Sequence, residues 1–150
     1  MQFLFLLLLL PVFLTPIYAE SQQLPTDKGI LLVNIATEPE KPIPDEQTKL
    51  KIDFVNPQTN LIQEHIDYTV LVTNAGGSVF GPIPLTHTSI GTITIPIQFK
   101  DGDNKVVVDI QGILFQPIPS EKASFSIALG DKQTTQPKET PNCKDTKKKT

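Results

Sequence analysis

Arginine and tryptophan are absent from this chain of 150 residues, and cysteine occurs once. All 13 basic side chains are lysines, so the chain lacks the forked guanidinium that holds phosphate and guanine through paired hydrogen bonds. We therefore expect no nucleic-acid partner. The one cysteine, Cys143, has no partner for a disulfide within the chain, so burial has to hold the fold together.

Signatures of catalysis are also missing. The chain has no G-x-S-x-G nucleophile motif, and Cys143 is far along the sequence from both histidines. We therefore expect that the protein is not an enzyme. There is no N-x-Ser/Thr sequon either, so no N-linked glycan is expected.

The two ends of the chain differ in composition from its middle. An apolar run followed by "IYA" predicts a secretory signal peptide over residues 1–19. No basic residue precedes that run, so an uncleaved membrane anchor is the alternative. We expect a linker over 20–28, one domain over 29–130, and a disordered, lysine-rich tail over 131–150. The product is then secreted or extracytoplasmic, and it contacts a membrane only if the first segment is retained.

Between these ends, 14 prolines and eight glycines separate short runs that alternate apolar and polar residues. This pattern is typical of an all-β domain. About seven strands, with turn residues every 8–12 positions, predict an immunoglobulin-like Greek-key β-sandwich. We expect strands at 29–37, 48–57, 65–74, 91–99, 105–110 and 122–129. Over 78–91, where Pro82 and Pro84 lack the N–H of a ladder bond, we expect either a broken strand or two short edge strands.

The apolar side of these alternating runs predicts the core. Its expected members are Ile66, Tyr68, Val70, Ile93, Ile95, Ile97, Phe99, Val106, Val108, Phe125 and Ile127.

The segment "KDGDN" (100–104) contains the Asp-Gly pair of a tight hairpin. It also resembles the start of a calcium loop. That loop needs an oxygen ligand, a glycine and a carboxylate where this chain has Lys105, Val106 and Gly112. We therefore expect a hairpin turn.

The two histidines, His65 and His87, lie beside connections that such a sandwich brings to the same end. Two imidazoles with a carboxylate from Glu64 or Asp67 would form a partial site for Cu(II) or Zn(II). The alternative is structural: His65 is the outward-facing first residue of a strand, and His87 is a loop residue bonded to backbone. We expect no cofactor, with copper or zinc as the alternative.

An apolar loop, "GILFQPIP", follows the strand at 105–110. One interpretation is that it docks a partner, either an unknown protein or a component of the cell envelope. The other is that Leu114 or Phe115 caps the open end of the sandwich. The residues concerned are Ile113, Leu114, Phe115 and Ile118.

The segments "HIDY" (65–68), "HTSIG" (87–91) and "FQPIP" (115–119) resemble those of small secreted immunoglobulin-like sandwich proteins of ammonia-oxidising archaea. The resemblance covers roughly residues 30 to 129 and implies export and fold. More distantly, the layout is similar to periplasmic copper-resistance sandwiches, which bind copper through histidines, although Met1 is the one methionine here. We expect a non-enzymatic binding or accessory module, and the alternative is an extracytoplasmic metal-binding protein.

Overall fold

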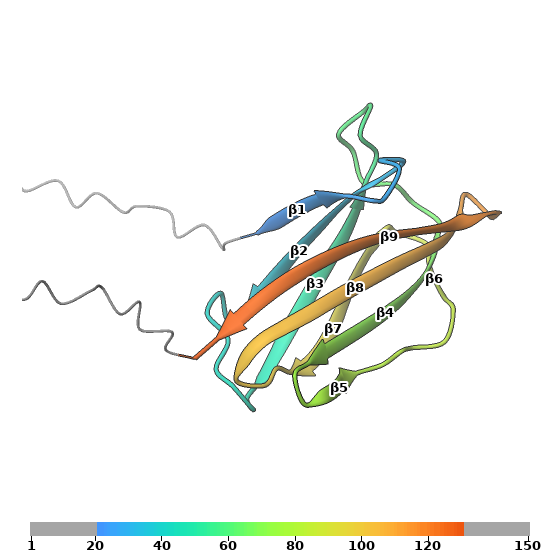
Figure 1. The fold of residues 1–150 in the computed structure, drawn as a ribbon. Coiled ribbons are helices and arrows are strands. Elements are labelled where there is room, and N and C mark those ends of the chain that lie inside the picture. The colour runs from blue at the N-terminus through green and yellow to red at the C-terminus, as the bar shows by residue number, and fades with distance from the viewer. Residues whose placement is uncertain (1–20, 131–150) are drawn as a thin grey trace, which may run out of the picture.

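The computed structural model describes residues 21–130, which form two antiparallel β-sheets packed face to face and contain no helix (Figure 1). The expected signal peptide (1–19) and tail (131–150) lie outside the described residues. The range 20–28, expected as a linker, contains the first strand.

The first sheet has the strand order β1-β2-β3-β7. Strands β2, β3 and β7 follow the alternating pattern of the sequence, because every second side chain faces the other sheet, whereas all four residues of β1 are exposed. In β3, for example, Leu50, Ile52 and Phe54 are fully buried. The strands are β1 (Gln22–Pro25), β2 (Leu32–Glu38), β3 (Gln47–Val55) and β7 (Thr92–Gln98).

The second sheet has the order β5-β4-β8-β9, and the short strand β6 pairs with the beginning of β4 on the same edge as β5. Of the two alternatives expected over 78–91, the structure confirms two short edge strands. The strands are β4 (Ile66–Asn74), β5 (Gly77–Phe80), β6 (Thr86–Thr88), β8 (Gly102–Ile113) and β9 (Gln116–Leu129).

The hydrophobic core lies between the two sheets. The core predicted from the sequence is confirmed, except that Ile93 and Ile127 are only partly buried. Five polar side chains that were not predicted to be buried lie in the interior as well: Thr26, Thr48, Thr88, Asn104 and Glu121.

The hairpin expected at 100–104 is wrong. β7 belongs to the first sheet and β8 to the second, so this segment crosses between the layers. The buried Asn104 side chain holds the crossing, accepting the Lys100 N–H and donating to the carbonyls of Lys100 and Gly102. The chain bends at Asp101, and the hydrogen bonds of the Asn104 side chain stand where a hairpin would have ladder bonds between its two strands.

The apolar loop expected at "GILFQPIP" (112–119) is wrong too, because β8 and β9 continue through this segment and join at a two-residue turn, Leu114-Phe115. Pro117 and Pro119 fit into β9 because this strand is the edge of its sheet, where a missing N–H costs no ladder bond.

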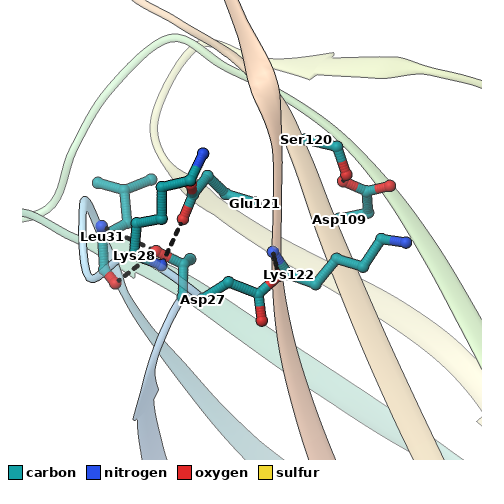
Figure 2. A network of polar contacts seen from close by, with 8 residues as sticks. Asp27, Lys28, Leu31, Asp109, Ser120, Glu121 and Lys122 are labelled. Atoms are coloured by element: carbon teal, nitrogen blue, oxygen red, sulfur yellow. Dashed lines mark hydrogen bonds and ion pairs between the residues drawn. The ribbon is translucent and has the colours of Figure 1, made fainter.

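A polar network fastens the β1–β2 turn of the first sheet to β9 of the second (Figure 2). Glu121, only 2% exposed, accepts the backbone N–H of Lys28 at 2.9 Å and pairs with its ammonium at 3.2 Å. Asp27 accepts the Lys122 N–H through its carboxylate and donates its own N–H to the Lys122 carbonyl. The network therefore links the two layers along one edge.

Candidate functional site

Three connections meet at one end of the sandwich, where the β8–β9 turn forms the tip at the right of Figure 1. The His65 N–H donates to the Ser89 carbonyl at 3.4 Å, and the Leu114 N–H donates to the His65 carbonyl at 2.7 Å. These bonds join the connections before β4, before β7 and after β8. The expectation that these loops share one end is confirmed. We call residues 56–67, 85–92 and 112–116 the histidine end.

The backbone of the histidine end is strained. His65, Leu114 and Phe115 have φ angles of 56°, 51° and 63°, although none of them is glycine. His65 is therefore not the first outward residue of a strand, because β4 begins only at Ile66. Left-handed backbone costs a bulky L-residue about 1–2 kcal/mol. A two-residue hairpin turn with both φ angles positive normally carries Asn-Gly, whereas here it carries Leu-Phe.

Three side-chain rings at the histidine end lie in contact with one another: those of His65, His87 and Phe115. The Phe115 ring centroid lies 4.3 Å from that of His65 and 5.3 Å from that of His87, and the imidazole centroids are 5.5 Å apart. Phe115 is 65% exposed and Leu114 is 54% exposed, so neither side chain caps the core. Ile113 and Ile118 are partly buried and pack against the core, which anchors the hairpin beneath its exposed turn.

A carboxylate fixes the orientation of one imidazole. Strand pairing sets Asp67 of β4 opposite His87 of β6, and the Asp67 Oδ1 lies 2.7 Å from the His87 Nδ1. An ionised carboxylate accepts hydrogen bonds only, so the His87 Nδ1 carries the proton and donates it. In neutral His87 the Nε2 then presents a lone pair, and this atom lies 3.3 Å from the Nδ1 of His65.

Asp67 lies between His87 of β6 and Gly112 of β8, and the position of Gly112 requires glycine. Gly112 of β8 is the cross-strand neighbour of Asp67, and a Cβ at this position would collide with the Asp67 carboxylate. The absence of a side chain at Gly112 therefore leaves the room in which Asp67 reaches His87.

Of the four residues expected as metal ligands, the structure brings three together. Asp67 contacts the far nitrogen of His87 rather than a point between the two rings, and Glu64 is an exposed neighbour of His65. Among residues 21–130, no group of three or more histidine, cysteine, aspartate or glutamate side chains is arranged to hold a metal ion. The protein thus offers two converging imidazoles and one carboxylate that orients them.

The three connections of the histidine end carry several exposed apolar side chains, and the sequence reasoning missed most of them. Gly91 lies so close to Ile62 that a Cβ on it would overlap the Ile62 side chain, which places two of the connections in contact. The signal in the sequence was the presence of large apolar residues inside segments bounded by turn residues. Besides the two turn residues, the exposed side chains are Leu61, Ile62, Leu85 and Ile90.

Comparison with known proteins gave no match to a family model, to a curated protein or to a solved structure. Within residues 21–130, no helix is long and apolar enough to cross a membrane.

Proposed function

We propose that this protein is a non-enzymatic binding module, secreted or held in the cell envelope, that contacts a partner protein through the histidine end. The observation that carries the proposal is the Leu114-Phe115 turn, which is strained and yet points its large side chains at solvent. Backbone strain persists where the surrounding structure enforces it, and it concentrates at functional sites. A turn selected for stability alone would carry Asn-Gly.

The chemistry of the surface indicates the chemistry of the partner. Exposed aromatic and aliphatic side chains at the centre of a patch are typical of protein interfaces. The histidine end carries two acidic residues, Glu64 and Asp67, and no lysine. An anionic bilayer attracts basic surfaces, so this surface is poorly suited to one. We infer a protein partner with an apolar contact surface and a basic rim.

The strand order supports an immunoglobulin-like variant of the sandwich. The sheet β5-β4-β8-β9 has the order of strands C′, C, F and G of that fold, and β2-β3-β7 takes the places of strands A, B and E. Within the described strands, β1 is an additional edge strand, and no strand takes the place of D. The loop end of such a sandwich is a frequent binding surface.

Export is part of the proposal, and it rests on the apolar run and small residues of the segment 1–19. In an extracytoplasmic setting the single cysteine, Cys143, can form a disulfide only with a second molecule.

Site-specific photo-crosslinking in the native host tests the binding surface. A photoreactive amino acid replaces Leu114 in one variant and Thr94, an exposed residue of β7 in the other sheet, in a matched control. We expect one discrete protein adduct from position 114, its loss when Phe115→Ser is added, and no adduct from position 94. Equal adducts from both positions, or no protein adduct from 114, would contradict the proposal.

A further inference from the structure

We propose that His65 and His87 together bind one divalent transition-metal ion, held between the Nδ1 of His65 and the Nε2 of His87. Zn(II) is the ion that the geometry favours, and Cu(II) is the alternative. Asp67 acts as a positioning residue through the Nδ1 of His87. The inference does not rest on the proposed partner, because metal binding is a property of this chain alone.

The separation of the two nitrogens carries the inference. They lie 3.3 Å apart. Two imidazole nitrogens that each lie about 2.0–2.1 Å from a tetrahedral ion are themselves about 3.3–3.4 Å apart. Adjacent nitrogens of a square-planar Cu(II) site are closer, at about 2.9 Å. The spacing of the two nitrogens therefore matches a tetrahedral ion, and binding requires each ring to turn its lone pair from the other ring towards a common point.

The protonation states are suited to a metal. The hydrogen bond to Asp67 keeps the proton of neutral His87 on Nδ1 and leaves Nε2 free to coordinate. A carboxylate on the far nitrogen of a ligating histidine fixes the tautomer and raises the basicity of the ligand. His65 coordinates through Nδ1 once its own ring proton resides on Nε2. No net proton leaves two neutral imidazoles in this step.

The backbone holds both rings in place before any ion arrives. His65 is fixed in its left-handed conformation by hydrogen bonds from its N–H to Ser89 and to its carbonyl from Leu114. His87 is fixed by the pairing of β6 with β4. Preorganised ligands lose less conformational entropy on binding, so the strain at His65 has a use in this site.

Two protein ligands leave the remaining coordination positions open. Within the described residues no third metal-ligating side chain completes the site, so water or a donor from another molecule fills it. Such a site exchanges its ion and does not hold the fold together, in contrast to a closed structural zinc site.

Calorimetric titration of the full chain with ZnCl₂ and, separately, with CuCl₂ tests the inference. All variants carry Cys143→Ser, so that the thiol of the C-terminal segment contributes no binding. We use His65→Asn because asparagine tolerates a positive φ, and His87→Gln for the second ring. We expect one ion per chain, a loss of affinity of at least tenfold in each histidine variant, and about 10–100-fold in Asp67→Asn.

Asp109→Asn is the matched control, because its carboxylate contacts Ser120 and Gln111 rather than a histidine. We expect it to bind the ion as the parent does, and circular dichroism confirms that every variant is folded. If the parent binds no ion, or if the histidine variants bind as tightly as the parent, the two rings form a hydrogen bond and no metal site. Tighter binding of Zn(II) than of Cu(II) would be the further mark of a tetrahedral site, since N-donor sites generally favour Cu(II).

Discussion

Gly112 shows how closely single residues are fitted behind the histidine end. Gly112→Ala places a Cβ against the Asp67 carboxylate and pushes it away from the His87 Nδ1. We expect a loss of about 1–3 kcal/mol in the free energy of unfolding and a change in the ¹⁵N chemical shifts of the His87 ring. Gly76→Ala is the control, because a Cβ there has open space. Similar ring shifts in both variants would mean that Gly112 does not position Asp67.

Glu121 makes stability depend on pH. The backbone N–H of Lys28 holds the pKa of this carboxyl below its usual range, and burial opposes this effect. Hydrogen bonds from the side chains of Lys28 and Thr26 and the charge of Lys28 also lower the pKa. A lowered folded-state pKa stabilises the fold above the unfolded-state pKa, and this stabilisation is lost as pH falls through the folded-state value.

We therefore expect the thermal midpoint of the parent to fall as pH drops below about 4.3, the usual value for glutamate. Glu121→Gln, which keeps the shape but has no charge to lose, should have a lower midpoint at pH 7 and a shallower decline in acid. Lys122 is the next residue of β9, and in Figure 2 its side chain extends away from the Glu121 carboxylate, so Lys122→Gln serves as a control. Parallel pH profiles of parent and Glu121→Gln would contradict this role.

Such buried polar residues could not be predicted from the sequence. Glu121 is buried because Lys28 meets it from another sheet, and these two residues are 93 positions apart in the chain. Nothing in the neighbourhood of Glu121 in the sequence specifies that partner. The positive φ at His65, Leu114 and Phe115 was unpredictable for a similar reason, because local preference disfavours it and tertiary bonds impose it.

At the scale of elements, β7 joins the core through alternate residues. Ile95 is buried, and its neighbour Thr94 is exposed on the opposite face. Ile95→Ala should cost about 2–5 kcal/mol of unfolding free energy, measured by urea denaturation, because it leaves a cavity between the sheets. Thr94→Ala should change it by less than about 0.5 kcal/mol. Equal effects of the two substitutions would mean that the register of β7 is wrong.

The sequence predicted the elements that alternate cleanly and failed at the connections between them. β3, β4 and β7 were expected nearly where they lie, because one face of each is buried. The Asp-Gly at 101–102 indicated a turn, yet a turn residue does not determine whether the next strand joins the same sheet. β1 was missed because its four residues are exposed and carry no alternation of burial.

At the scale of the whole molecule, the unusual features gather at one end. The histidine end combines four non-glycine residues with positive φ (Asn60, His65, Leu114 and Phe115), three stacked or tilted rings and several exposed apolar side chains. The strand order predicted from the sequence placed both histidines and the apolar loop at this end of the sandwich. It could not predict that Phe115 would lie over both imidazoles, since that contact depends on the tight turn. A folded core with an exposed, strained end is what a binding scaffold needs.

The claim that this end serves binding rather than folding is tested most directly by the unfolding free energy of one variant, Leu114→Asn/Phe115→Gly. The substitution gives the β8–β9 turn the residues that its backbone prefers and removes the exposed side chains. If the native residues serve a partner, the variant should be more stable than the parent by about 1–3 kcal/mol in urea denaturation, because the strain of two left-handed residues is relieved. A variant less stable than the parent would show that Leu114 and Phe115 hold the fold together, and it would contradict the account.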